Sequence, residues 1–255
     1  MSAIGVFDSG IGGLSVLKAL RELMPEQDYA YLADSGYAPY GERDSDYVIS
    51  RSKVCLEFLL NAGCSAIVIA CNTATALAAR TLREAHPDLP IVGIEPAIKP
   101  AAALTKSGHV GVLATQGTLS SSKFLALLEA TQAANPQLCV HTYAPNGLAL
   151  AIEQQNAVQI EVLSTIACKA MLDAGCDTVV LGCTHYPLLT SLLQAKLMHP
   201  TFGACNLVDP AEAVAVQTKR LLPAASYKNS NGGVLTLHST GAITELEKAV
   251  TRYLT

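Results

Sequence analysis

Short apolar runs alternate with longer amphipathic segments along almost the whole chain. An apolar run of about four to eight residues between turn residues is typical of a buried strand, whereas apolar residues at every third or fourth position are typical of a helix. The pattern predicts strands at 3–8, 29–33, 66–71, 91–95, 110–114, 138–143, 178–183, 206–208 and 234–238. It predicts helices near 13–24, 45–61, 74–86, 97–106, 119–134, 157–174, 187–198, 211–222 and 241–254. This alternation indicates an α/β fold with mostly parallel sheets.

One segment occurs twice. Residues 60–73 and 172–185 each contain Leu, a polar residue, Ala-Gly-Cys and an apolar strand, and then a second cysteine, Cys71 or Cys183, followed by polar residues. Any two strand–helix–strand units share a hydrophobic pattern, but the recurrence of Ala-Gly-Cys in register with the second cysteine favours an internal duplication.

The duplication predicts two pseudo-symmetric α/β domains with a site in the cleft between them. The first is expected to comprise 1–97 plus 211–255 and to carry Asp8 and Cys71. The second is expected to comprise 98–210 and to carry Cys183 and His185. The carboxyl ends of strands in open α/β sheets are where ligands bind, so the two cysteines are expected to share one site.

Composition narrows the class of protein. Half of the 255 residues are apolar and 15% are charged, as in a compact enzyme. The net charge is −4 and no run of Lys or Arg occurs, which argues against nucleic acid or an anionic membrane as a partner. No apolar stretch approaches the roughly 20 residues that span a bilayer. The chain enters its first strand without a signal-peptide pattern, so we expect a cytoplasmic protein whose eight cysteines are reduced.

Cys71 and Cys183 are the strongest candidates for chemistry. Free cysteines are often buried core residues, which is the plain alternative. Both, however, follow apolar strands and precede expected helix N-termini, where unpaired N–H groups and the helix dipole favour a thiolate. His185 lies two residues after Cys183, but a structural zinc site needs about four ligands, so we expect no metal. The other six cysteines are expected in the core or on the surface.

The segment from Asp8 to Gly13 contains three glycines after the first strand. Glycine lets the backbone approach a ligand closely, and a following helix N-terminus receives anions. A phosphate loop is one interpretation, although its lysine is absent, and a plain capped turn is another. A bound carboxylate, with Asp8 orienting the chemistry, fits best with the two cysteines.

Four segments together resemble the glutamate racemases, within the wider aspartate/glutamate racemase superfamily. They are Phe7–Gly13, Ala33–Asp34 with Pro39–Gly41, Ala70–Ala74 and Gly182–Pro187, and Ser239–Gly241 before the last helix is also similar. The resemblance covers essentially the whole chain. It implies two pseudo-twofold α/β domains, 1,1-proton transfer without metal or pyridoxal phosphate, and supply of D-glutamate for peptidoglycan. We also expect a homodimer.

The resemblance also implies roles for individual residues. Cys71 and Cys183 would be the two acid/base residues, with Asp8 supporting the first, and His185 and Glu153 supporting the second. The substrate would be held by Ser9, Pro39, Tyr40, Gly41, Asn72, Thr73, Thr118 and Thr184 in addition to Asp8 and His185. A racemase of aspartate or of another small amino-acid-like substrate is the alternative. A catalytically silent binding module is disfavoured because both cysteines, Asp8 and His185 are present.

Overall fold

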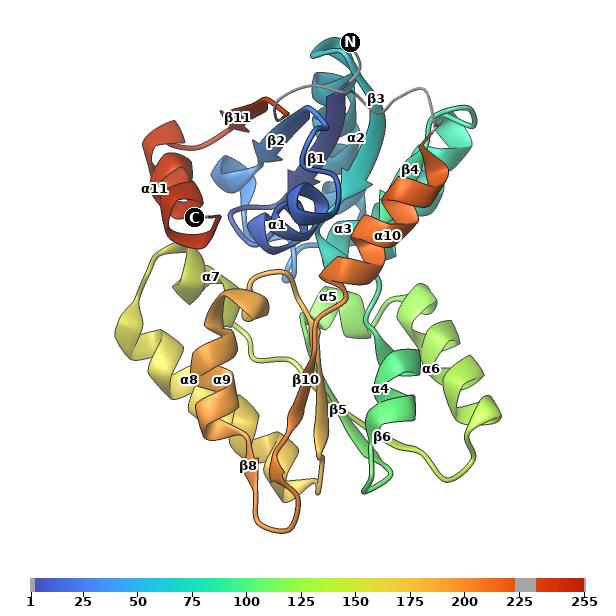
Figure 1. Ribbon diagram of the computed structural model, residues 1–255, viewed down its shortest axis with the longest axis vertical. Helices are drawn as coiled ribbons and strands as arrows, with labels where there is room; N and C mark the ends of the chain where they lie inside the picture. Colours follow the sequence, from blue (N-terminus) through green and yellow to red (C-terminus); the bar gives the residue numbers. More distant parts are fainter. Residues whose placement is uncertain (1–2, 223–232, 255) are drawn as a thin grey trace.

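Two parallel sheets form the framework of the protein. The computed structural model describes residues 3–222 and 233–254, and Figure 1 shows one sheet above the other. The first sheet has five parallel strands in the order β11 (Leu235–Ser239), β2 (Tyr29–Ala33), β1 (Ala3–Asp8), β3 (Cys64–Ile69) and β4 (Ile91–Gly93). The second has four in the order β10 (Asn206–Val208), β7 (Thr178–Gly182), β5 (His109–Ala114) and β6 (Cys139–Tyr143).

Helices cover both faces of the first sheet. Apolar side chains of α1 (Leu14–Leu23), α10 (Ala211–Leu221) and α11 (Ile243–Tyr253) pack on one face. Those of α2 (Ser45–Asn61) and α3 (Asn72–Ala85) pack on the other. Because both faces are buried, the strands are almost wholly apolar, as expected for a parallel sheet.

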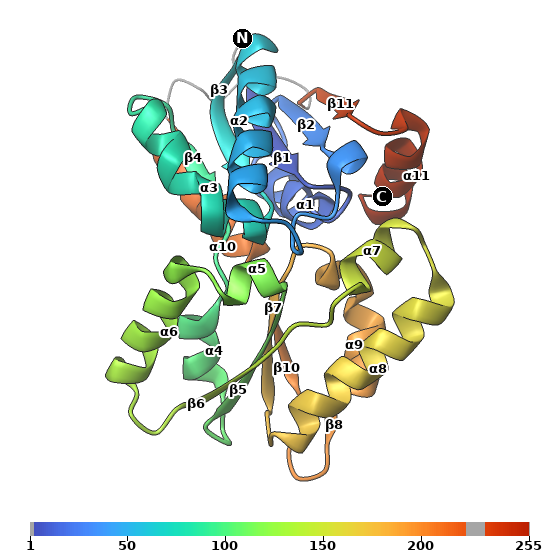
Figure 2. The ribbon, with the colours of Figure 1, turned by 180° about the vertical axis from the view of Figure 1, so that it is seen from behind.

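The second sheet is covered in the same way. On one face lie α4 (Ile98–Leu104), the short α5 (Gln116–Leu119) and α6 (Ser122–Ala134). On the other lie α7 (Leu148–Glu153), α8 (Ala157–Asp173) and α9 (Thr190–Lys196). A small antiparallel hairpin joins β8 (Met198–His199) to β9 (Gly203–Ala204). Figure 2 shows α5 and α7 at the junction of the two layered halves.

The expected α/β class with parallel sheets is confirmed, and the nine expected strands are all present within a few residues. Three details of the expectation are wrong. The helix expected at 119–134 begins only at Ser122, because Ser121 caps it by accepting the Phe124 N–H, and the short α5 that precedes it was not expected. The helix expected at 187–198 begins with a 3-10 turn at Tyr186–Leu189 before α9. The helix α7 and the β8–β9 hairpin were not expected at all.

The chain returns to the first half after β10. Helix α10 packs on α1, and β11 adds to β2 at the edge of the first sheet. No helix within residues 3–222 and 233–254 is both long and apolar enough to span a membrane.

Candidate active site

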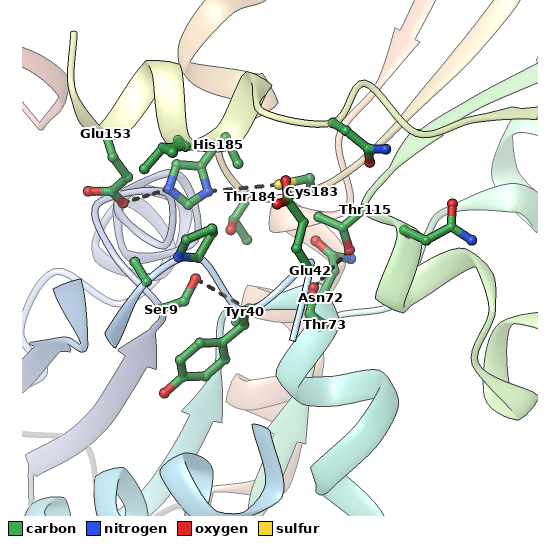
Figure 3. Close-up of a pocket in the computed structure, with 18 of the residues that line it drawn as sticks. Ser9, Tyr40, Glu42, Asn72, Thr73, Thr115, Glu153, Cys183, Thr184 and His185 are labelled. Carbon is green, nitrogen blue, oxygen red and sulfur yellow. Dashed lines mark hydrogen bonds and ion pairs between the residues drawn. The ribbon is translucent and has the colours of Figure 1, made fainter. Parts of the chain in front are cut away.

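The carboxyl ends of strands from both sheets meet at one pocket. From the first half it is lined by Ser9, Ala38–Glu42 and Cys71–Thr73. From the second half it is lined by Thr115, Gln116, Pro145–Gly147, Ala149, Leu150, Glu153 and Cys183–Tyr186. Figure 3 shows these side chains gathered where the halves face each other. Both sequence-predicted cysteines are therefore in the same pocket, one from each half.

Cys71 caps the N-terminus of α3. Its Sγ accepts the Ala74 N–H at 3.4 Å and donates to Ser9 Oγ at 3.8 Å. Burial, and then the charge of Asp8, raise the pKa of the Cys71 thiol to about 12. The helix N-terminus lowers this pKa through the Ala74 N–H, in the expected direction, but desolvation outweighs it. At neutral pH this sulfur carries its proton.

Cys183 has a different neighbour. Its Sγ lies 3.8 Å from His185 Nδ1, and His185 Nε2 lies 2.6 Å from Glu153 Oε1. Burial lowers the pKa of His185, but the hydrogen bonds and negative charges of Cys183 and Glu153 outweigh it and leave that pKa well above its usual value. This shift favours the imidazolium form, in which both ring nitrogens donate, one to Glu153 and one to Cys183. A cation at this distance stabilises negative charge on Cys183 Sγ.

Asp8 is fully buried beneath the glycine-rich loop. Its Oδ1 accepts the Gly10 N–H at 2.8 Å and its Oδ2 accepts the Thr184 hydroxyl at 2.9 Å. Burial raises the pKa of Asp8 despite the opposing charge of His185. The carboxyl group thus joins the first half to the segment that carries Cys183, and it acts on Cys71 through charge.

The two halves are in close contact at the glycines that follow Asp8. The Ile11 N–H donates to Glu153 Oε1 at 2.6 Å. A Cβ on Gly10 would lie 1.6 Å from that oxygen, and one on Gly12 would lie 2.5 Å from His185 Nδ1. Residues without a side chain are therefore required at both positions for Glu153 and His185 to reach the loop.

Polar groups for a ligand come from both sides of the pocket. Asn72 is buried, and neither its amide oxygen nor its amide nitrogen has a hydrogen-bond partner within the described residues. The Thr73 hydroxyl lies 2.9 Å from that of Thr115, which donates to Thr118 at 3.0 Å. Two of the residues expected to hold the substrate, Asp8 and Thr118, are buried and do not line the pocket.

The loop that carries Pro39, Tyr40 and Gly41 is anchored by a buried carboxylate. Asp34 accepts from Arg51 Nη2 at 2.8 Å and Nε at 3.0 Å, and from the Tyr40 hydroxyl. The Thr240 hydroxyl donates to the same carboxylate at 2.9 Å. These bonds tie the end of β2, helix α2 and the end of β11 to one wall of the pocket.

Replacing Arg51 with methionine is expected to lower the free energy of unfolding by about 3 kcal/mol, because it leaves the buried Asp34 carboxylate without its cation. The measurement is urea unfolding followed by circular dichroism. Arg80→Met is the matched control, since its ion pair with Glu84 is exposed. Equal midpoints for the two variants would contradict a stabilising role for the Asp34–Arg51 pair.

Several lining residues were not predicted from the sequence. Gln116 follows the carboxyl end of β5, and Glu42 follows the Pro39–Gly41 turn; their positions in the chain were the available signal. Asn146 is an ordinary loop residue in the sequence, and Tyr186 lies in the Gly182–Pro187 segment without a role assigned to it. Within the described part of the chain, no three His, Cys, Asp or Glu side chains gather closely enough to hold a metal ion.

Comparison with known proteins shows which family this chain belongs to. The family model described as Asp/Glu/Hydantoin racemase matches residues 4–218. A glutamate racemase of Ectopseudomonas mendocina is 49% identical over 222 residues, which are 86% of this chain and 81% of that protein. Glutamate racemase isoform RacE1 from Bacillus anthracis has a TM-score of 0.85 at 31% identity, with 99% of this chain and 94% of that chain covered.

A further solved structure is glutamate racemase from Escherichia coli in complex with L-glutamate and the activator UDP-MurNAc-ala. Its TM-score is 0.80 at 31% identity, and the match covers 99% of this chain and 96% of that chain. The fold and the sequence therefore define an isomerase of the racemase class. The chain belongs to the Asp/Glu/Hydantoin racemase family, and its relatives place it with the glutamate racemases, as the sequence resemblance predicted.

Proposed function

We propose that this protein interconverts L-glutamate and D-glutamate by proton transfer at Cα between two thiols. The observation that carries the proposal is that Cys71 and Cys183 reach one pocket from two different sheets. Inversion of a stereocentre requires proton removal on one face and proton delivery on the other, and two thiols on separate supports can do both. The bound L-glutamate of the Escherichia coli relative supports glutamate as the substrate.

The two sulfurs are prepared for opposite roles. In the direction from L- to D-glutamate, Cys183 as a thiolate takes the α-proton, and the Cα–H electron pair stays on the substrate as a planar carbanion. The Cys71 thiol then gives its proton to the opposite face. Cys183 ends as a thiol and Cys71 as a thiolate, which is the starting state for D-glutamate. Imidazolium His185 beside Cys183 and the raised pKa of Cys71 favour the first state in the free protein.

The pocket also offers the groups that a dicarboxylic amino acid needs. The unpaired Asn72 amide and the Thr73 and Thr184 side chains lie next to the cysteines in the sequence and line the pocket. Preorganised donors stabilise the charge that develops on the substrate carboxylate as the α-proton leaves. We assign Ser9, Asn72, Thr73, Thr184 and the Pro39–Gly41 loop to substrate binding.

We also propose a division of the chain into two domains, one around each sheet. The first domain comprises 1–97 plus 211–255, of which 1–2, 223–232 and 255 lie outside the described residues, and the second comprises 98–210. Support comes from α10 and β11, which pack on and pair with elements of the first sheet. The protein is cytoplasmic, acts as a homodimer and supplies D-glutamate for peptidoglycan synthesis.

The function is tested by racemisation in D₂O with protein dialysed against a chelator and hydroxylamine. Because the Cys71 thiol exchanges with solvent, D-glutamate formed from L-glutamate is expected to carry deuterium at Cα, while the remaining L-glutamate stays protiated early in the reaction. The mirror result is expected from D-glutamate. L-Aspartate is run in parallel. Product that retains the original proton, or activity restored only by metal or pyridoxal phosphate, would exclude two-thiol transfer, and faster turnover of aspartate would reassign the substrate.

A further inference from the structure

Tyr31 is a fully buried residue of β2 that lies under the glycine-rich loop and outside the pocket lining. Its hydroxyl donates to the Gly10 carbonyl oxygen at 2.7 Å, and a Cβ on Gly13 would lie 2.8 Å from the same hydroxyl oxygen. Burial and the nearby carboxylates raise the pKa of Tyr31 well above its usual value, so the hydroxyl keeps its proton. One side chain therefore lies against both ends of the Gly10–Gly13 turn.

This turn determines where Glu153 lies. The peptide unit between Gly10 and Ile11 contributes the Gly10 carbonyl to Tyr31 and the Ile11 N–H to Glu153 Oε1, at 2.6 Å. Rotation of that one unit would move both groups together, because a peptide is planar. A Cβ on Gly10 would lie only 1.6 Å from Glu153 Oε1, so the Glu153 side chain is already in contact with the loop.

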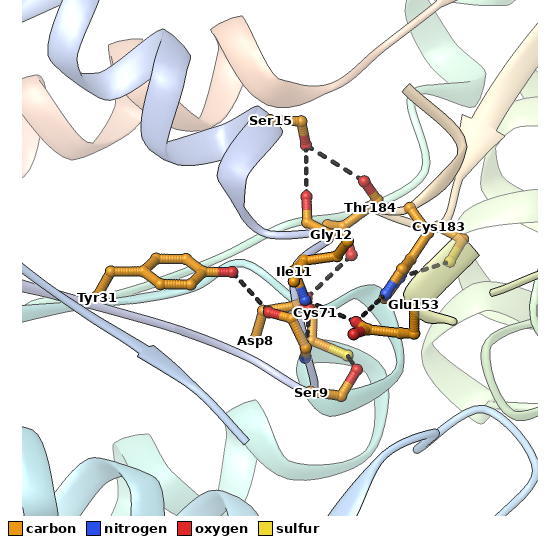
Figure 4. A network of polar contacts seen from close by, with 12 residues as sticks. Asp8, Ser9, Ile11, Gly12, Ser15, Tyr31, Cys71, Glu153, Cys183 and Thr184 are labelled. Atoms are coloured by element: carbon orange, nitrogen blue, oxygen red, sulfur yellow. Dashed lines mark hydrogen bonds and ion pairs between the residues drawn. The ribbon is translucent and has the colours of Figure 1, made fainter. Parts of the chain in front are cut away.

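Glu153 in turn contacts the acid/base group of the second half. Its Oε1 lies 2.6 Å from His185 Nε2, and His185 Nδ1 lies 3.8 Å from Cys183 Sγ. Figure 4 shows these contacts running from Tyr31 past Ile11 to Glu153 and Cys183. A tyrosine of the first sheet is thus connected to the thiol delivered by the second sheet.

We infer that Tyr31 is a positioning residue for the reaction, and that its hydroxyl holds the Gly10–Ile11 peptide so that Glu153 keeps His185 oriented on Cys183. The inference rests on the proposed function for its kinetic readout. Phenylalanine at position 31 would fill the same space but leave the buried Gly10 carbonyl without its donor. An unpaired buried carbonyl is costly, so the peptide turns to find another partner and the Ile11 N–H leaves Glu153.

The chain provides a matched control two residues away on the same strand. Tyr29 is also buried, and its hydroxyl donates to Leu20 O at 2.9 Å and Met24 O at 3.1 Å, at the far end of α1. Tyr31→Phe and Tyr29→Phe both remove one buried phenolic hydroxyl. Both are expected to lower the melting temperature to a similar extent, but only Tyr31→Phe disturbs the loop.

The experiment measures kcat and KM for both enantiomers and follows the titration of His185 by NMR of the ¹⁵N-labelled imidazole. The charged groups that face His185 are Asp8, Glu153 and Cys183. Tyr31→Phe is expected to lower kcat roughly tenfold with little change in KM, because acid/base geometry rather than substrate binding is lost. His185 is expected to titrate at a lower pH, since its contact with Glu153 weakens. Tyr29→Phe is expected to stay within about twofold of wild type.

A double variant that combines Glu153→Gln with Tyr31→Phe tests whether Tyr31 acts on His185 through Glu153. If Tyr31 acts through Glu153, the double variant is expected to be little worse than Glu153→Gln alone. Additive losses, an unchanged His185 titration in Tyr31→Phe, or equal kcat in the two phenylalanine variants would overturn the inference.

If Tyr31→Phe does not fold, Gly10→Ala takes its place, because it displaces Glu153 while keeping the hydroxyl; an unchanged kcat and His185 titration there would overturn the route. If the wild-type protein does not racemise glutamate, the proposed function fails and the His185 titration alone decides the role of Tyr31.

Discussion

Cys71→Ala and Cys183→Ala are each expected to reduce racemisation at least about a thousandfold in both directions, because each variant leaves one face of Cα without a group that can remove or deliver a proton. Both side chains lie at a pocket rather than in the middle of a sheet, so the variants are expected to fold, as checked by circular dichroism. Cys64→Ala and Cys176→Ala are the matched controls. They occupy equivalent positions at the start of the two strand-to-cysteine segments and are buried away from the pocket.

The single variants are also expected to differ from each other. With Cys71 removed, Cys183 can still take the α-proton of L-glutamate and return solvent deuterium to the same face. L-Glutamate is therefore expected to exchange its α-proton in D₂O without inversion. With Cys183 removed, exchange of D-glutamate depends on a Cys71 thiolate, and the pKa of Cys71 is raised by burial to about 12.

The sign of the pH dependence follows from that pKa. Below it the thiolate fraction of Cys71 grows about tenfold for each pH unit, so exchange of D-glutamate by Cys183→Ala is expected to be slow at pH 7 and to rise steeply up to pH 10. The measurement is loss of the Cα proton signal by ¹H NMR. Racemisation near the wild-type rate in either variant, or equal loss in Cys64→Ala, would show that the two-thiol assignment is wrong.

The fold was predictable because buried parallel strands leave a strong pattern. The register of Cys64 with Cys176, and of Cys71 with Cys183, indicated an internal duplication, and the polar residues after each strand predicted most of the pocket lining. Helix α7 was missed although Leu148–Glu153 is rich in helix-forming residues, because six residues show too little periodicity.

Other parts of the site depend on contacts between distant residues. The sequence does not show that Glu153 accepts the Ile11 N–H across 142 positions of the chain. The raised pKa of Cys71 could not be predicted from the sequence for a related reason. A helix N-terminus can be inferred from sequence, but the depth of burial that outweighs it requires the packing of both halves.

His185→Asn and Asp8→Asn are expected to impair proton transfer at different faces. Asparagine at 185 cannot carry the charge that stabilises a thiolate on Cys183, so removal of the α-proton from L-glutamate becomes harder. Asparagine at 8 removes the negative charge that raises the pKa of Cys71, so the Cys71 thiolate becomes a weaker base towards the α-proton of D-glutamate. It also removes the carboxylate whose Oδ2 accepts the Thr184 hydroxyl. Both variants are expected to lower kcat/KM by roughly a hundredfold.

The asymmetry cannot appear in kcat/KM itself. The equilibrium constant between enantiomers is one, so kcat/KM falls equally in the two directions for any variant. The asymmetry is expected in the kinetic isotope effects measured with α-deuterated substrates. His185→Asn makes proton transfer to Cys183 more nearly rate-limiting, so the isotope effect for L-glutamate is expected to rise. Asp8→Asn is expected to raise the isotope effect for D-glutamate instead. His86→Asn, a surface histidine paired with Glu57, is the control. Identical isotope effects for both enantiomers in both variants would show that the two thiols do not have separate supporting groups.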